Sequence, residues 1–168
     1  MRVLGVDPGL TRCGLAIVDE LPGRKVSLQT VMVFRTDAAS DLSQRLLELD
    51  QALAKVIKEF KPDCVAVEQV FSQHNLKSVM GTAQAAGLAI LNAAKSDCEV
   101  FTYTPTQVKA SVTGSGKADK RQMGRMIQKI CNLASPLSPP DASDAVALAV
   151  CHLWRNSTVE KIKKRKVS

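Results

Sequence analysis

The spacing of apolar residues changes once along this chain, close to residue 40. Before that point, the segments 2–7, 14–19 and 26–35 are short apolar runs separated by turns that contain Pro and Gly. Runs of this length with such short links are typical of strands in an antiparallel meander. The N-terminal part of the chain therefore predicts strands that lie side by side in sequence order.

Beyond residue 40, helix-like and strand-like segments alternate. Over 41–60 the apolar residues recur every three or four positions, as in an amphipathic helix, and Pro62 ends this pattern. We also expect strands over 64–68 and 99–103, with helices over about 75–95, from Pro105, around Met123 to Ile130 and over 141–155. The helix over 75–95 has a face of small residues that we expect to pack closely, made of Ala83, Ala86, Gly87 and Ile90.

This order of elements predicts an α/β domain over residues 1–155. Alternating helices and strands favour parallel pairing, whereas the meander is antiparallel. We therefore expect a mixed five-stranded sheet, with three antiparallel strands followed by two parallel ones, flanked by helices. Residues 156–168 are rich in lysine, and we expect them to form a disordered basic tail outside the domain.

The composition restricts the class of partner. The 168 residues include 23 Lys and Arg against 16 Asp and Glu, which gives a formal net charge of +7 and a pI of about 9.3. A basic balance favours nucleic acid or another anionic surface, without distinguishing between them. The longest uninterrupted apolar run, 85–91, is far too short to cross a bilayer, so we expect no membrane association.

The cysteines indicate a cytoplasmic protein. Five cysteines lie far apart in the sequence, mostly within apolar stretches, as reduced core thiols do. No group of Cys and His has the spacing of a zinc site, and the N-terminus shows no signal-peptide pattern.

Four acids stand at the ends of apolar segments, where a folded chain has little structural use for them. Asp7 and Glu68 each end a strand-like run, and Asp141 and Asp144 open the last helix. Ligand sites of α/β sheets lie at the carboxyl ends of strands, so Asp7 and Glu68 converge if their strands are neighbours. Asp141 and Asp144 share one face of a helix, and that turn would complete a cluster of oxygen donors.

Such a cluster needs a cation to stay ionised, because carboxylates are rarely buried unless they are paired or bind metal. Mg²⁺ suits these donors, since it typically takes one or two carboxylates and leaves its other positions to water and phosphate. Two such ions would flank a scissile phosphate. Structural roles are the alternative, because an Asp before Pro-Gly commonly forms a turn, and Asp141 and Asp144 suit the dipole of a helix N-terminus.

Several segments also occur, in the same order, in a known family. They are residues 3–11, 80–85 and 108–114, together with Val67-Glu68-Gln69-Val70-Phe71 and Asp141-Ala142-Ser143-Asp144-Ala145. The first segment is similar to the opening of actin-like ATPases and sugar kinases as well. The last two closely resemble the RuvC family of Holliday-junction resolvases, within the ribonuclease-H-like superfamily. The similarity covers about residues 1–155.

The resemblance implies a ribonuclease-H-like fold and a Mg²⁺-dependent endonuclease. Family members resolve Holliday junctions by paired symmetric nicks during homologous recombination and DNA repair, leaving 5′-phosphate and 3′-hydroxyl ends. The catalytic and metal-binding acids of the family match Asp7, Glu68, Asp141 and Asp144. The resemblance also implies two Mg²⁺ ions per subunit, with Mn²⁺ as a substitute. It further implies a homodimer that binds four-way junction DNA and works with the RuvA–RuvB branch-migration complex.

Further residues are candidates for binding DNA. The resemblance matches two family lysines to Lys109 and Lys120, and the family's aromatic residue at the junction centre to Phe71. An exposed ring at Phe71 could stack on an unpaired base, at about 1–3 kcal/mol, although a ring folded onto the core is the alternative. Lys109, Lys117 and Lys120 flank a glycine-containing loop and could neutralise phosphates, although a solvated helix face would look similar.

Other interpretations account for less of the sequence. Residues 114–117 hint at a phosphate loop, but Ala118 stands where that motif needs Ser or Thr. We expect His152 to be a core residue and neither it nor His74 to ligate metal. A nuclease acting on structured RNA is the main alternative function, since short ribonuclease-H-like proteins share the Asp-x-Gly opening. An actin-like ATPase would need a second phosphate-binding half, which 168 residues do not hold.

Overall fold

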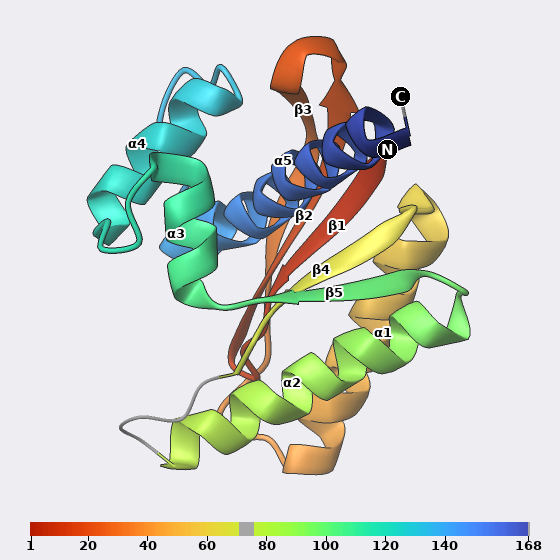
Figure 1. The fold of residues 1–168 in the computed structure, drawn as a ribbon. Helices are drawn as coiled ribbons and strands as arrows, with labels where there is room; N and C mark the ends of the chain where they lie inside the picture. The colour runs from red at the N-terminus through yellow and green to blue at the C-terminus, as the bar shows by residue number, and fades with distance from the viewer. Residues whose placement is uncertain (71–75, 168) are drawn as a thin grey trace.

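The computed structural model describes residues 1–70 and 76–167, and it describes side chains over 1–70 and 79–156. The elements follow the order that the sequence predicts (Figure 1). The strands are β1 (Arg2–Asp7), β2 (Arg12–Leu21), β3 (Lys25–Arg35), β4 (Cys64–Glu68) and β5 (Glu99–Tyr103). The helices are α1 (Leu42–Phe60), α2 (Leu76–Lys95), α3 (Pro105–Thr113), α4 (Lys120–Ile130) and α5 (Pro140–Val167).

The strands form one mixed sheet in the order β3-β2-β1-β4-β5. β1 pairs antiparallel with β2, and β2 pairs antiparallel with β3. β4 pairs parallel with both β1 and β5. The predicted sheet of three antiparallel and two parallel strands is therefore confirmed.

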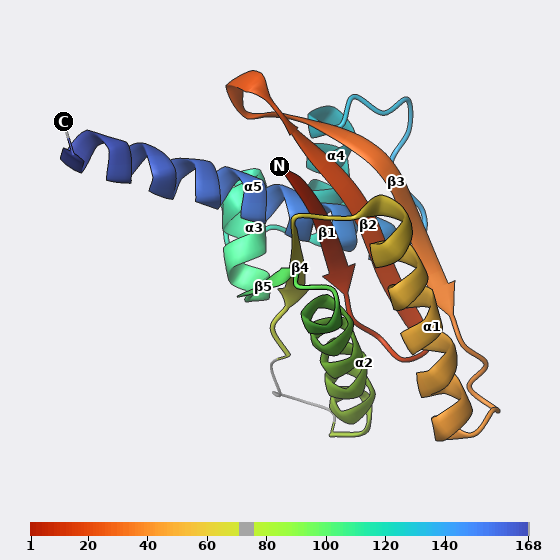
Figure 2. The same ribbon diagram turned by 90° about the vertical axis from the view of Figure 1, so that its right-hand side faces the viewer.

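Helices cover both faces of this sheet. α1 and α2 lie on one face, and α3, α4 and α5 lie on the other (Figures 1 and 2). Neighbouring residues of β1 alternate between the two cores, since Val3 packs with the α5 side whereas Leu4 and Val6 pack with the α1 side. The strands are thus apolar on both faces, which explains their nearly uninterrupted apolar runs.

Two glycines let α5 lie directly against β1 and β2. A Cβ atom at Gly5 would overlap the backbone carbonyl oxygen of Ala145, and one at Gly14 would overlap that of Asp141. Neither position allows a side chain, because the helix backbone fills the space that the side chain would need. The first turns of α5 are consequently fixed over the strand that ends in Asp7.

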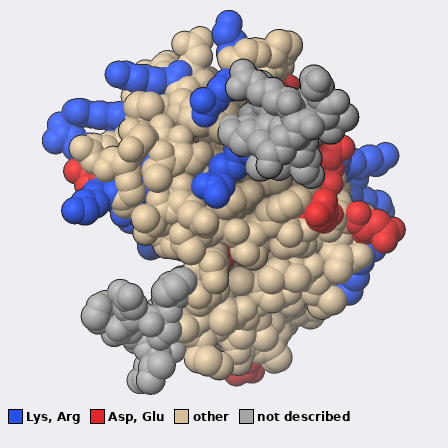
Figure 3. All heavy atoms as spheres, viewed as in Figure 1, with Lys and Arg blue, Asp and Glu red and all other residues tan. Residues whose placement is uncertain are grey.

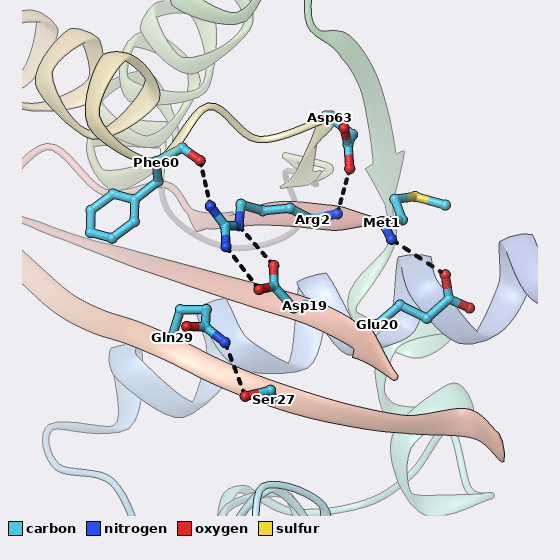
Figure 4. Close-up of polar contacts among 8 residues, drawn as sticks. All are labelled: Met1, Arg2, Asp19, Glu20, Ser27, Gln29, Phe60 and Asp63. Carbon is cyan, nitrogen blue, oxygen red and sulfur yellow. Dashed lines mark hydrogen bonds and ion pairs between the residues drawn. The ribbon is translucent and has the colours of Figure 1, made fainter. Parts of the chain in front are cut away.

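At the other end of β1, Arg2 joins three elements (Figure 4). Its guanidinium donates through Nε and Nη2 to Asp19 of β2, over 2.8 and 2.9 Å, and through Nη1 to the carbonyl oxygen of Phe60, over 3.0 Å. The same pair holds the pKa of Asp19 below its usual value, first through the hydrogen bond. This contact links β1, β2 and the end of α1 at the end of the sheet where β1 begins, away from Asp7.

Two details differ from the expectations. The backbone of α5 continues to Val167 and does not end at Arg155, where the sequence predicts the end of this helix (Figure 2). Residues 156–167 contain no Pro or Gly to stop a helix and are rich in the helix formers Glu, Lys and Arg. The assignment of residues 156–168 to a tail outside the domain stays a prediction.

The buried face of α2 also differs from the expected one. Of the small residues that were expected to pack closely, only Ala86 is buried, whereas Ala83, Gly87 and Ile90 are exposed. The face against the sheet is instead made of Ala85, Ala86, Ala89 and Ala93. A helix that is apolar on most of its surface has no polar face to identify the side that packs on the sheet. Within the described part of this single chain, nothing packs on the exposed Ala83, Gly87 and Ile90, so the close packing expected there stays a prediction. Within the described residues, no helix has both the length and the apolar character needed to cross a membrane.

Candidate active site

Asp7 and Glu68 end neighbouring parallel strands. Val6 of β1 is in register with Val67 of β4, so the residues that follow them leave the sheet at the same edge. Both acids are half-buried. The expected convergence of these two carboxylates is therefore seen.

Asp141 and Asp144 reach the same edge from the first turns of α5. Gly14 is paired with Asp7 in the β1–β2 register. The carbonyl group of Asp141 occupies the space that a side chain on Gly14 would need. Asp141 and Asp144 are half-buried, with side-chain exposures of 18% and 31%. The close contact between helix and sheet thus brings acids from distant parts of the chain to one place.

The four acids line one cavity of about 420 Å³. Its wall also includes Lys109 and Lys120, and it is completed by Pro8, Thr82, Pro105, Val108, Met123 and Leu148. Two of the predicted DNA-binding lysines therefore face the cavity that holds the predicted metal ligands. Lys117 is exposed and is not among the residues that line this cavity.

The carboxylates oppose one another's ionisation. Burial, followed by the charges of Glu68, Asp144 and Asp141, raises the pKa of Asp7 from 3.8 to about 8. Burial and the charge of Asp144 also raise the pKa of Glu68. Burial raises the pKa of Asp144, although the Lys120 ammonium, 3.5 Å from its Oδ2 atom, acts in the opposite direction. Positive charge in this cavity would stabilise the ionised acids.

The donors suit a hard divalent cation, with one restriction. Among the described residues, no group of three or more His, Cys, Asp or Glu side chains is close enough to hold a metal ion together. The acids thus line an open cavity and do not form a closed cage. This arrangement fits Mg²⁺, which is commonly bound through one or two carboxylates, with its other positions left to water and phosphate.

Local capping fixes the helices that carry the two lysines. Thr104 and Gln107 form a reciprocal capping box at the start of α3, and Asp119 and Gln122 form another at the start of α4. Lys120 is the first residue of α4, so the cap places it beside Asp144. Lysine and arginine side chains gather over the α3–α4 part of the molecule (Figure 3).

Other candidates from the sequence have different outcomes. Phe71 and His74 lie outside the described residues. His152 is a buried core residue, as expected, with its Nδ1 atom 2.8 Å from the hydroxyl of Tyr103 and its ring next to Phe101. Burial lowers the pKa of His152, which favours its neutral form.

Three arginines that were not predicted from the sequence lie near the acids. Arg12 lies with its Nε atom 3.5 Å from Oδ2 of Asp141. Arg121 and Arg125 of α4 line a cavity of about 440 Å³ that also includes Lys120 and Asp144. Their spacing of four residues on a helix could have indicated a shared basic face, whereas nothing in the sequence relates Arg12 to Asp141.

Comparison with known proteins identifies the family. The family model described as crossover junction endodeoxyribonuclease RuvC matches residues 3–152. The chain is 54% identical over 162 residues to the crossover junction endodeoxyribonuclease RuvC of Salinispora arenicola, covering 96% of this chain and 93% of that protein. It is 52% identical over 155 residues to the protein of the same name from Streptomyces avermitilis, covering 92% and 88%.

Solved structures agree with this match. The structure of T. thermophilus RuvC in complex with a Holliday junction substrate is similar with a TM-score of 0.88 and 29% identity, covering 93% of this chain and 94% of that chain. The yeast mitochondrial Holliday junction resolvase Ydc2 shares the fold, with a TM-score of 0.69 at 12% identity, covering 97% of this chain and 83% of that chain. With a family model that matches most of its length and relatives above 50% identity, this chain belongs to the RuvC family of crossover junction endodeoxyribonucleases.

Proposed function

We propose that this protein is an endonuclease that resolves Holliday junctions by paired symmetric nicks during homologous recombination and DNA repair. One observation carries the proposal: in a chain of the RuvC family, four acids from three separate elements line a single cavity together with two lysines. The solved relative that this chain resembles holds a Holliday junction substrate.

Asp7, Glu68, Asp141 and Asp144 are the proposed catalytic and metal-binding residues. RuvC nucleases depend on divalent metal, and Mg²⁺, two ions per subunit, fits the hard oxygen donors and the open cavity. Mn²⁺ has similar ligand preferences and is the proposed substitute. Bound to these four acids, the ions would activate a water for attack on phosphorus and stabilise the departing O3′ oxygen. Breaking the P–O3′ bond in this way would leave 5′-phosphate and 3′-hydroxyl ends.

The lysines are proposed to hold the DNA backbone at this cavity. Lys109 and Lys120 line it, so a phosphate beside the acids lies within reach of both ammonium groups. Lys117, exposed in the loop before α4, is proposed to contact a more distant phosphate.

Phe71 follows β4 two residues after Gln69 and is proposed to stack on a base at the junction centre. A fluorescent base analogue at that position, unquenched by the protein, would exclude this stacking.

A homodimer fits the near two-fold symmetry of a four-way junction, because it presents two equivalent sites. The outward side of α2 supports this assembly. It exposes Met80 (61%), Ile90 (42%) and Leu91 (47%), and Ala83 and Gly87 lie exposed between them. A second copy of this chain is the proposed partner on this face.

The RuvA–RuvB complex is a further proposed partner. The proposed location is the cytoplasm, because the five unpaired cysteines suit its reducing environment.

Asp7→Asn tests the proposed chemistry. The variant should bind a four-way junction as tightly as the unchanged protein, whereas its cleavage rate in Mg²⁺ should fall by more than about 100-fold. Even the outer-shell partners of metal ligands commonly contribute 10–100-fold, and a direct ligand contributes more. Asp97→Asn makes the same change at an exposed turn before β5, at the opposite edge of the sheet, and should leave cleavage intact.

The same assay separates the two candidate substrates. Junction binding is measured by fluorescence anisotropy, and cleavage by gel analysis of a four-way DNA junction, linear duplex DNA and structured RNA. Retained cleavage by Asp7→Asn would exclude Asp7 as a metal ligand. Faster cleavage of structured RNA than of the junction would replace the proposed substrate.

A further inference from the structure

A second cavity adjoins the one that holds the acids. It has a volume of about 340 Å³ and shares Asp7, Pro8, Thr82 and Asp141 with the first. The remaining wall is different, because it is formed by residues 9–12, Gly81 and Arg45. The two cavities thus meet at Asp7 and Asp141, and each has its own pair of cationic side chains.

Arg45 is held in place without an acidic partner. It lies in the first turn of α1, where its Nε donates to Oγ1 of Thr36 over 2.9 Å and its Nη2 donates to Oγ1 of Thr11 over 2.7 Å. Among the described residues, no carboxylate lies within 4.0 Å of its guanidinium. A cation near a helix N-terminus is disfavoured by the helix dipole, so neither helix stability nor an ion pair accounts for a charge here. The guanidinium retains further N–H donors for an anion.

Arg12 can exchange its present carboxylate partner for another anion. Among the described residues it forms one ion pair, with Asp141, which is long at 3.5 Å, and 54% of its side chain is exposed. A long ion pair with one mostly exposed partner contributes little to stability, so the guanidinium can exchange the carboxylate for another anion with little loss. Arg12 and Arg45 line the same cavity, which places two guanidinium-bearing side chains beside the acids.

We propose that Arg12 and Arg45 form a binding site for a backbone phosphate of the DNA strand that is cut, next to the phosphate at the acids. The inference rests on the proposed nuclease function and assigns it a further DNA contact. Arginine binds phosphate oxygens through its planar fork of donors, and both cavities open beside the same acids. A DNA strand continues on both sides of the cut phosphate. Lys109 and Lys120 serve one side, and the arginine pair serves the other.

The salt dependence of junction binding tests this site. Anisotropy titrations with a four-way junction in EDTA, where binding is measured without cleavage, compare the unchanged protein with Arg12→Gln, Arg45→Gln and the double variant. Each lost phosphate contact should reduce the magnitude of the negative slope of log K against log[salt] by about 0.9, which corresponds to about 8-fold weaker binding at 0.1 M salt if the affinities are equal at 1 M. Lys58→Gln, in the last turn of α1, removes the same charge far from the cavity and should leave the slope unchanged.

A neutral linkage in the DNA locates the contact. With the unchanged protein, a methylphosphonate next to the cut phosphate should weaken binding, and in the double variant the same linkage should have no further effect. Unchanged slopes, or an equal methylphosphonate effect in the double variant, would overturn the inference. If Arg45→Gln fails to fold, as shown by its thermal melt, Arg12→Gln decides the outcome, because its side chain is exposed. The proposed function fails separately, if the unchanged protein binds junctions but does not cut them.

Discussion

At the scale of single residues, the buried position of Asp7 lowers the stability of the fold when this carboxyl group is ionised. Its pKa is raised from 3.8 to about 8, first by burial and then by neighbouring acids. For an acid whose folded pKa is raised, the folded state binds more protons than the unfolded state between these two values. The free energy of unfolding therefore falls as the pH rises from about 4 towards 8. Asp7 thus lowers the stability of the fold at neutral pH, as expected for a residue kept for the proposed metal-binding role and not for stability.

Asp7→Asn should accordingly stabilise the metal-free protein. The variant has no charge to bury, so in EDTA at pH 8 its free energy of unfolding should exceed that of the unchanged protein by on the order of a few kcal/mol, with one pKa unit worth about 1.4 kcal/mol. At pH 4 the two proteins should be almost equally stable. Urea unfolding at both pH values measures the difference, and a less stable variant at pH 8 would contradict it.

Addition of Mg²⁺ provides a second arm of the same experiment. A ligand that binds only the folded state raises the free energy of unfolding. Mg²⁺ should therefore stabilise the unchanged protein more than Asp7→Asn. Asp97→Asn, at an exposed turn, should respond to Mg²⁺ as the unchanged protein does.

At the scale of elements, the contact between α5 and the sheet decides the geometry of the acids. Strand and helix patterns identified these elements, because each pattern depends on the local alternation of apolar residues. Their distance from one another is set by Gly5 and Gly14, which remove the side chains that would hold α5 away from β1 and β2. A glycine within a strand is a weak signal in sequence, and only the packed structure shows the backbone that approaches it.

Gly14→Ala should displace the first turn of α5, since the added methyl group would overlap the carbonyl oxygen of Asp141. We expect a loss of about 1–3 kcal/mol in the free energy of unfolding, as for other overpacked sites, together with weaker binding of Mg²⁺. Chemical denaturation and calorimetric titration with Mg²⁺ measure the two effects.

Gly124→Ala is the matched control for this change. It lies within α4, and no atom within 4 Å would meet the added methyl group. Alanine in a helix interior is more favourable than glycine by about 0.8–1.0 kcal/mol, so this variant should be more stable than the unchanged protein. If Gly14→Ala behaves as Gly124→Ala does, the close approach of α5 does not position Asp141.

At the scale of the whole molecule, the exposed apolar side of α2 is a surface that no described part of the same chain covers. Leu91→Glu places a charge on this face and should convert the proposed dimer into a monomer of 18.1 kDa, because an unpaired charge is costly to bury in an interface. Sedimentation velocity measures the mass.

Leu21→Glu is the comparison for the assembly experiment. Leu21 is similarly exposed (41%) but ends β2, away from α2, so its substitution should leave the mass unchanged. If the protein with Leu91→Glu is still a dimer, the dimer interface lies on another surface.

Most of the secondary structure was readable from the amino-acid sequence, because it rests on residues that are close in the chain. The mixed sheet followed from the order of these elements, and the family from motifs that occur in order along the chain. The periods of apolar residues indicate strands and helices, and acids at the ends of apolar runs point to the edge where Asp7, Glu68, Asp141 and Asp144 meet. Arg12 and Arg45 could not be recognised in this way. No sequence pattern distinguishes either of them from other surface arginines. Their common cavity exists only once β2, α1 and α5 are packed together. The buried side of α2 likewise depended on the sheet beside it, since a helix that is apolar on most of its surface can bury more than one face.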